Sequence, residues 1–337
     1  QEILAPMAPI TAGPGLMLAS VNGDLASIPL SMLTTKPYTP TKTQMAFASY
    51  RQAPWLVLEK DIAYAPSATA LVSLRSSQSK PSATMPFVGF GDPDFSVTGK
   101  LPEPPSTMGV RSSQKFDRIA DQDLLIADPL PDMIPVIPPL PETRQEVIEI
   151  SALFGADPKK SLYLGERASR SNALTQDLSH YRVVAFATHG LIPGDVPGLS
   201  QPALAMSTRD PSGYLLTSQD ILGMKLDAEW VILSACNSGA GDGAGSDALT
   251  GLGRSFFYAG SKSIYVTQWP VESESAKRLV TKTLTYYQKD GLSRAVSANK
   301  SARDLLTTGS MVMSGAEISF AHPAFWAPYI VVGEPGR

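Results

Sequence analysis

Cys236 is the single cysteine of the 337-residue chain, and it follows an apolar run at residues 230–233. Small residues surround it in the sequence Ser-Ala-Cys-Asn-Ser-Gly at 234–239. A second apolar run, at 183–187, ends in the same manner at Thr-His-Gly, which contains His189. A thiolate nucleophile and an imidazole base are the pair that cysteine-dependent acyl transfer requires. We therefore predict that Cys236 is a nucleophile and that His189 is its general base.

Both residues follow predicted β-strands, which explains how residues so distant in the sequence could meet. The carboxyl ends of neighbouring parallel strands lie side by side at one edge of a sheet, where the sites of α/β proteins form. A helix N-terminus facing the thiol would further favour the thiolate. Gly190 has no Cβ, so its N–H can approach a substrate carbonyl closely. We expect the N–H groups of Gly190 and Cys236 to form the oxyanion hole.

Each of these residues also has a purely structural interpretation. A lone cysteine is commonly a buried thiol, and a lone histidine is commonly a capping or hydrogen-bonded residue. Cys236 lies after its strand among Ser, Asn and Gly, where loops reach solvent, and this favours the catalytic role. His180 ends a predicted helix, where a cation is ordinary. His322 precedes a proline near the C-terminus, where we expect it to pack.

The Gly-rich residues 239–245 follow the Cys236 strand and raise the question of a phosphate loop. They lack the Lys-Ser/Thr ending of a P-loop and the spacing of a dinucleotide fingerprint, so we interpret them as a mobile loop, of the kind that serves as a cleavage or activation loop. Asp242 and Asp247 are either solvated turn or N-cap residues or the lining of a pocket for a basic side chain. The His, Asp and Glu residues show no metal-ligand spacing, and we predict neither a metal nor another cofactor.

The composition is that of a globular chain that can bury a large core, with 43% hydrophobic and 18% charged residues. The formal net charge of -3 and the absence of a long basic tract give no indication of a nucleic-acid partner. No apolar run reaches the length of a transmembrane helix, so we expect a soluble protein without a membrane partner. One cysteine excludes an intrachain disulfide and a Cys-rich zinc site. The chain begins at Gln1 without a Met or a signal peptide, and we expect a fragment or a processed product.

Strands and helices alternate along most of the chain. The patterns predict strands at 16–21, 55–59, 62–65, 85–90, 161–164, 183–188, 203–206, 230–234 and 263–268. They predict helices that start at 67 and 141, and helices over 169–178, 218–222, 248–259, 272–289 and 292–306. This alternation predicts an α/β fold, with a mostly parallel sheet flanked by helices. The Pro-rich stretch from Pro102 to Pro141 divides the chain into two halves, 1–140 and 141–337.

These motifs make the chain resemble the CHAT domain, a bacterial relative of caspases and separases among the cysteine peptidases. Two matching blocks surround the predicted dyad, Ala187–Gly190 and Leu233–Gly239. The further matching blocks are Phe90–Pro93, Leu140–Thr143, Leu164–Ala168, Leu249–Phe256 with Ala259–Gly260, Gln268–Val271 and His322–Ala327. The resemblance extends over about residues 16–333 and therefore covers nearly the whole chain.

The resemblance implies a caspase-like fold, with residues 1–140 as an N-terminal pseudo-protease half and residues 141–337 as a C-terminal active half. It implies a hydrolase, a cysteine endopeptidase whose His189–Cys236 dyad cleaves peptide bonds through a thioester acyl-enzyme. The expected partners are a protein or peptide substrate and, upstream, tetratricopeptide-type repeats or a regulatory protein. The expected compartment is the bacterial cytoplasm or periplasm.

The residues that would set specificity are less clearly marked than the dyad. Relatives that cut after Arg or Lys place an Asp two residues before the nucleophile, and this chain has Ser234 there. Asp247 could supply the acidic group from the following loop. Trp269 lies where caspase-like enzymes bind the substrate backbone and the S2 side chain, unless it belongs to the core. Two other functions stay open: a catalytically silent CHAT-type interaction module, and a cysteine-dependent acyltransferase or hydrolase of small molecules.

Overall fold

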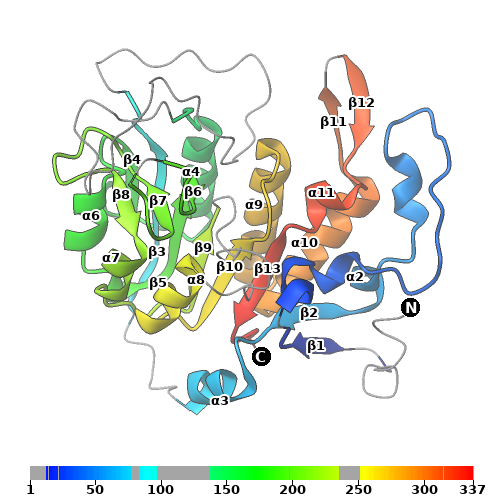
Figure 1. The fold of residues 1–337 in the computed structure, drawn as a ribbon, viewed down its shortest axis with the longest axis horizontal. Helices are drawn as coiled ribbons and strands as arrows, with labels where there is room; N and C mark the ends of the chain where they lie inside the picture. The colour runs from blue at the N-terminus through cyan, green and yellow to red at the C-terminus, as the bar shows by residue number, and fades with distance from the viewer. Residues whose placement is uncertain are drawn as a thin grey trace.

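A computed structural model describes residues 13, 15–21, 23–76, 83–96, 137–196, 198–234, 251–313 and 315–336. Its centre is one eight-stranded sheet, in the order β1-β2-β13-β10-β9-β5-β3-β4 (Figure 1). The strands of this sheet are β1 Leu16–Ala19, β2 Asp61–Tyr64, β3 Met85–Pro93, β4 Leu162–Gly165, β5 Tyr181–Ala187, β9 Trp230–Leu233, β10 Ser263–Thr267 and β13 Tyr329–Gly333.

Neighbouring strands of the sheet are parallel, with β10 and β13 as the antiparallel pair. β13, β2 and β1 therefore run opposite to β3, β4, β5, β9 and β10. We call the edge at which the latter five strands end the carboxyl edge. Thr267 at the end of β10 pairs with Tyr329 at the start of β13, so the segment that enters β13 also lies at the carboxyl edge.

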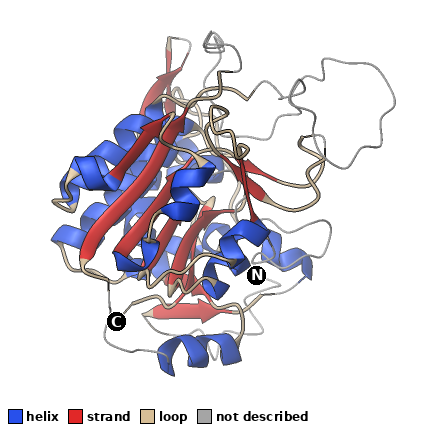
Figure 2. Ribbon diagram, turned by 90° about the vertical axis from the view of Figure 1, so that its left-hand side faces the viewer, coloured by secondary structure: helices blue, strands red, loops and turns tan. Residues whose placement is uncertain are grey.

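Helices cover both faces of the sheet (Figure 2). One face packs against α4 Glu142–Leu153, α9 Ser273–Lys289 and α10 Arg294–Thr308. The other packs against α6 Arg170–Thr175, α7 Ser218–Leu222 and α8 Leu252–Tyr258. Side chains alternate along β10, because Tyr265 joins the first core whereas Ile264 and Val266 join the second. Both faces of the central strands are thus buried, which explains their continuous apolar runs and confirms the predicted α/β class.

Two small sheets lie at the carboxyl edge, outside the main sheet (Figure 1). The three-stranded sheet consists of β6 Gly190–Leu191, β7 Ala203–Ala205 and β8 Leu215–Thr217. The β11–β12 hairpin consists of Ser310–Met313 and Ala316–Ser319. The remaining helices are α2 Leu56–Glu59, α3 Ala68–Ser76, α5 Pro158–Ser161, α11 Pro323–Trp326 and the 3-10 turns Gly23–Ser27, Leu30–Met32, Ala48–Gln52 and Leu178–His180.

Most predicted elements are found where the sequence places them, but the strand predicted at 55–59 is wrong. Residues Leu56–Glu59 form the short helix α2, in which the Lys60 N–H donates to the Leu56 carbonyl at 2.9 Å. The turn buries Leu56 and Val57 in different cores, and local composition typical of a strand does not decide the backbone conformation here. In the described ranges, no helix has the length and apolarity needed to cross a membrane.

Strands from both predicted halves share the one main sheet. β3, from the half 1–140, lies between β5 and β4 of the half 141–337. β1 and β2 extend the same sheet beyond β13. The assignment of 1–140 as a pseudo-protease half and 141–337 as an active half stays a prediction.

Candidate active site

The predicted site residues that the structure describes all lie at the carboxyl edge. His189 and Gly190 follow β5, Ser234 follows β9 and Trp269 follows β10. These three strands are adjacent and parallel, so the runs that precede His189 and Cys236 end side by side. Cys236 and Asp247 lie outside the described residues, as does the Gly-rich loop 239–245.

Two residues from other segments hold the buried imidazole of His189. The Nε2 atom of His189 is 2.8 Å from the carbonyl oxygen of Pro138. A carbonyl oxygen can only accept a hydrogen bond, so Nε2 carries the proton, and the lone pair of the neutral ring is on Nδ1. The ring of Phe95 lies against the imidazole, with the two centroids 5.7 Å apart. The imidazole is therefore fixed in both tautomer and orientation.

Sequence reasoning does not identify Phe95 or Pro138 as site residues. Phe95 follows the block Phe90–Pro93, and Pro138 precedes the block Leu140–Thr143. The position of these two residues beside matching blocks is therefore the only sequence signal that they belong to the site. Pro138 contributes a backbone carbonyl, which has no side-chain signature, and each contact joins segments far apart in the chain.

Backbone pairing after His189 orients Gly190. The Ala205 N–H donates to the His189 carbonyl at 2.9 Å, and the buried Thr188 hydroxyl donates to the Ala205 carbonyl at 2.5 Å. Gly190 pairs with Leu204 at the next position of the β6–β7 ladder. Alternate residues of an antiparallel pair direct their backbone groups toward and away from the partner strand. The Gly190 N–H therefore points away from β7, as a donor for an oxyanion would need to do.

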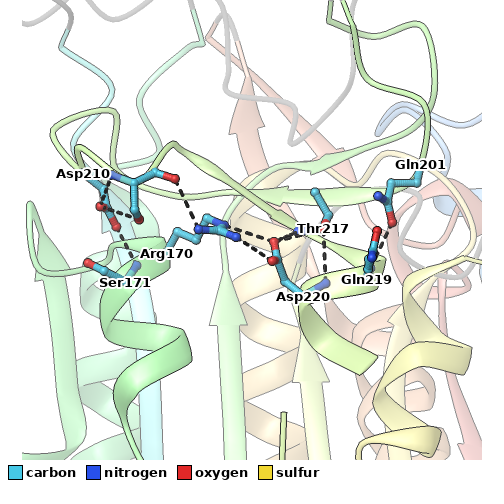
Figure 3. Close-up of polar contacts among 8 residues, drawn as sticks. Arg170, Ser171, Gln201, Asp210, Thr217, Gln219 and Asp220 are labelled. Carbon is cyan, nitrogen blue, oxygen red and sulfur yellow. Dashed lines mark hydrogen bonds and ion pairs between the residues drawn. The ribbon is translucent and has the colours of Figure 1, made fainter. Parts of the chain in front are cut away.

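An ion pair attaches the three-stranded sheet to its neighbouring helices (Figure 3). Arg170 at the start of α6 donates to both carboxylate oxygens of Asp220 in α7, with Nη2–Oδ1 at 2.5 Å and Nε–Oδ2 at 3.1 Å. Asp220 Oδ2 also accepts from the N–H and the hydroxyl of Thr217, the last residue of β8. Such two-pronged pairs are among the stronger polar contacts in proteins. They join β8 to both helices.

Asp210 makes a second attachment in the same network (Figure 3). Its Oδ2 accepts from the Ser171 N–H at 2.5 Å, and its Oδ1 accepts from the N–H and the hydroxyl of Ser212. Burial alone would raise the pKa of Asp210, but the hydrogen bonds donated by Ser171 and Ser212 outweigh burial and lower the pKa to about 2. Asp210 is therefore a carboxylate throughout the physiological pH range.

Ser234 forms a buried, uncharged pair with Tyr329. The Ser234 Oγ lies 3.0 Å from the Tyr329 hydroxyl, and the Ser234 N–H donates to the Phe186 carbonyl at 2.9 Å. The ring of Tyr329 stacks on that of Tyr265, with centroids 4.7 Å apart. A hydroxyl pair thus occupies the strand end where an acidic residue would serve cleavage after Arg or Lys.

The end of β10 carries two residues of different character. Trp269 is half-buried, packs against the core beneath α9, and has its Nε1 3.5 Å from the Ala324 carbonyl of α11. Gln268 is buried, and its Nε2 has no hydrogen-bond partner within the described part of the chain. An amide buried without a partner costs free energy. The matching block Gln268–Val271 includes this residue, but sequence reasoning assigned it no role in the site.

The other two histidines have structural contacts. His180 is exposed and lies 3.2 Å from Asp177, where the 3-10 turn ends. His322 accepts a hydrogen bond from the Ala324 N–H as the N-cap of α11, and its ring lies 5.1 Å from that of Phe47. Burial lowers the pKa of His322. In the residues that the structure describes, no group of three His, Cys, Asp or Glu side chains could hold a metal ion.

No curated protein sequence matches the chain. Among solved structures, it is similar to separase of Saccharomyces cerevisiae in the separase–securin complex, with 15% identity and a TM-score of 0.41. That alignment covers 82% of this chain but only 14% of the separase chain. The family model of the CHAT domain matches residues 3–334. Because this match extends over almost the whole sequence, the chain belongs to the CHAT domain family.

Proposed function

We propose that the chain is a cysteine endopeptidase in which Cys236 attacks a peptide carbonyl and His189 transfers the protons. The observation that carries this proposal is the hydrogen bond from His189 Nε2 to the Pro138 carbonyl. It leaves Nδ1 as the basic nitrogen at the edge where β9 ends. Ser234 is held to β5 through the Phe186 carbonyl, and Cys236 follows two residues later, within roughly 7 Å of extended chain.

In the first half-reaction, Nδ1 of His189 takes the proton of the Cys236 thiol, and the thiolate sulfur adds to the carbonyl carbon of the scissile bond. The N–H groups of Gly190 and Cys236 donate to the oxyanion that forms. The C–N bond then breaks, and the imidazolium gives its proton to the leaving amine. A thioester to Cys236 remains. In the second half-reaction, Nδ1 takes a proton from water, and the resulting hydroxide adds to the carbonyl carbon of the thioester. The C–S bond then breaks and releases the acid, and the imidazolium returns its proton to the thiolate of Cys236.

Membership of the CHAT domain family supports this proposal, because that family resembles the caspase-like peptidases in the blocks around His189 and Cys236. The proposal gives Ser234 and Trp269 substrate-binding roles at the ends of β9 and β10, and it keeps Asp247 as an acidic group of the loop after Cys236. Upstream repeats or a regulatory partner would control access of the protein substrate to the dyad.

Thiol chemistry gives a direct test, because Cys236 is the only cysteine and alkylation therefore reports on a single sulfur atom. The rate of reaction with iodoacetamide near pH 7 is expected to fall about tenfold or more in His189→Ala, which loses the base. His180→Ala is the matched control, since His180 is an exposed histidine distant from the dyad, and it should react at the wild-type rate.

Cleavage of a peptide library, followed by mass spectrometry, completes the test. Wild type should cut and both Cys236→Ala and His189→Ala should not. Cleavage that persists in both variants would refute the dyad. A thiol that reacts independently of His189, together with no cleavage by wild type, would instead identify a silent interaction module.

A further inference from the structure

The β11–β12 hairpin projects from the body of the molecule at the carboxyl edge (Figure 1). β12 leads through α11 into β13, whose first residue, Tyr329, pairs with Thr267 at the end of β10. Trp269 also contacts α11 through the Ala324 carbonyl. The base of the hairpin therefore lies at the same edge of the sheet as His189.

Hydrogen-bonded and non-hydrogen-bonded pairs alternate along the hairpin, and this alternation shows which backbone groups of β11 point outward. The Phe320 N–H donates to the Gly309 carbonyl at 3.0 Å at the base of the hairpin. Pairing then alternates along the ladder, and Val312 lies opposite Glu317 at a position whose backbone groups face away from the partner strand. The N–H and C=O of Val312 are thus directed to the outer edge of β11, and those of Glu317 to the outer edge of β12.

The two outer edges of the hairpin are covered to different degrees. On β12, the Ser319 N–H donates to the Ala46 carbonyl at 2.9 Å, as expected for a residue whose backbone groups face away from β11. On β11, the Ser310 carbonyl accepts from Arg278 Nη1 at 3.2 Å. Beyond Ser310, the described residues offer no partner to the outward N–H and C=O of Val312. The open edge of the hairpin is therefore that of β11.

The side chains of this edge are apolar. Val312 is 71% exposed, and Met311 and Met313 on either side of it are partly exposed. An exposed apolar strand with unpaired backbone groups is a template on which another extended chain can pair. Proteins that bind extended peptides use such edges, with main-chain hydrogen bonds for affinity and side-chain contacts for selectivity.

We propose that the open edge of β11 binds the substrate, as an extended segment of an unfolded polypeptide that adds to the hairpin as a third strand. The N–H and C=O of Val312 pair with the backbone of that segment, and its apolar side chains contact Val312 and Met313. The outward N–H and C=O of one strand residue match the backbone of an extended polypeptide rather than a small molecule. The substrate class is thus a protein with an unfolded, apolar stretch beside the scissile bond. The cleavage step rests on the proposed function, whereas binding to β11 does not.

Binding is measured on the Cys236→Ala protein, which keeps the hairpin and cannot cleave. The probe is fluorescein-labelled, reduced and carboxymethylated α-lactalbumin, a permanently unfolded chain, and the readout is fluorescence anisotropy. Val312→Pro deletes the outward N–H and no hydrogen bond of the hairpin, and the Kd should rise about fivefold or more. Glu317→Pro removes the outward N–H on the outer edge of β12, together with the hydrogen bond from the Ser310 hydroxyl to the Glu317 carboxylate, and should leave the Kd unchanged within about twofold. Absence of binding, or an equal Kd in Val312→Pro, overturns the proposal.

Hydrogen exchange gives a second readout with the hairpin sequence intact. The bound chain should slow exchange of the Val312 amide relative to the Glu317 amide, and equal exchange with and without the probe overturns the proposal. So does concentration-dependent dimerisation that Val312→Pro abolishes, because a second copy would then occupy the edge. Binding without cleavage by wild type refutes the peptidase function alone. Cleavage with an unchanged Kd in Val312→Pro refutes this inference alone.

Discussion

The two small sheets at the carboxyl edge are attached to the molecule in opposite ways. The three-stranded sheet is held by the Arg170–Asp220 ion pair and by Asp210, and it has a buried core of its own beneath it. The β11–β12 hairpin is held at its outer edges by Arg278 and by the loop at Ala46. Its residues Ile318 and Ser319 are buried, whereas Val312, Ala316 and Glu317 near its turn are exposed.

The firmness with which each sheet is attached corresponds to its position relative to His189. The three-stranded sheet begins at Gly190, directly after His189, so a shift of this sheet would move the residue that we propose as the base. Groups that transfer protons need rigid support, because small displacements are costly for rate. The hairpin carries no residue of the proposed dyad and leaves backbone groups open. One sheet positions a side chain, and the other leaves an edge at which we propose the substrate pairs.

Among the substitutions near the three-stranded sheet, Phe95→Ala should cause the largest loss of stability. Phe95 is buried in the small core beneath the three-stranded sheet and contacts the His189 ring. Truncating a buried aromatic leaves a cavity, and we expect the free energy of unfolding to fall by about 3 kcal/mol. Urea unfolding measures this loss. Val312→Ala on the hairpin is the comparison and should cost less than about 0.5 kcal/mol. Similar losses at both positions would remove the contrast between the two sheets.

Arg170→Met should have the next largest effect. It keeps the apolar stem of Arg170 but leaves the carboxylate of Asp220, whose side chain is 17% exposed, without its cation. Removal of one partner from a largely buried pair is destabilising, and a loss of about 2 kcal/mol in the free energy of unfolding is expected. The rate of Cys236 alkylation should also fall, because β8 is released next to the segment that holds His189. A variant as stable as wild type would show that the ion pair adds nothing to the attachment.

The Asp210 attachment predicts how stability depends on pH. The pKa of Asp210 in the folded chain, about 2, is lower than its ordinary 3.8. Ionised Asp210 therefore stabilises the folded chain fully above pH 3.8, and this stabilisation is lost as the pH falls through the pKa of the folded chain. The shift corresponds to about 2 kcal/mol, lost between about pH 4 and pH 2. Urea unfolding at pH 6 and pH 3 should therefore show a weaker pH dependence in Asp210→Asn than in wild type. If the free energy of unfolding changed equally with pH in both proteins, Asp210 would be excluded as the source of the pH dependence.

Arg278→Met should have the smallest effect on stability. Arg278 is half-exposed, pairs with Glu274 within the same helix and donates to the Ser310 carbonyl. Exposed pairs of this kind contribute about 0.5 kcal/mol or less to the free energy of unfolding. Thermal or urea unfolding of Arg278→Met beside Arg170→Met measures the contrast directly. If the two variants lose equal stability, the hairpin is attached as firmly as the three-stranded sheet.

The strands that end at the candidate site could be predicted because local sequence signals agree there. The runs before Thr188, Ser234 and Trp269 are apolar and contain β-branched residues, and each ends where small or polar residues begin. Strands buried on both faces need only this pattern, without alternation. Since the runs alternate with helices, the parallel sheet and the common edge of their ends follow from connection rules.

The contacts that orient His189 could not be predicted in the same way. Phe95 and Pro138 act across long separations, and Pro138 acts through its backbone, so neither leaves a local pattern. The β11–β12 hairpin was missed although Ser314-Gly315 between two apolar runs is a turn signal, because each run is short. Local composition also failed at Leu56, where an apolar run typical of a strand forms a helical turn.

The position of β13 has a consequence for how the protein is made. This strand lies between β10 and β2, in the interior of the sheet, although it is synthesised after every other strand. β1 and β2 leave the ribosome before the other described strands of the sheet but can join it only when residues 329–333 are in place, so their pairing waits for the closure of a loop that extends from Tyr64 to Val332. A nascent chain that stops before Tyr329 therefore exposes the edges of both β10 and β2, a state prone to aggregation. Loss of these few residues would split the sheet in its interior rather than shorten it at an edge.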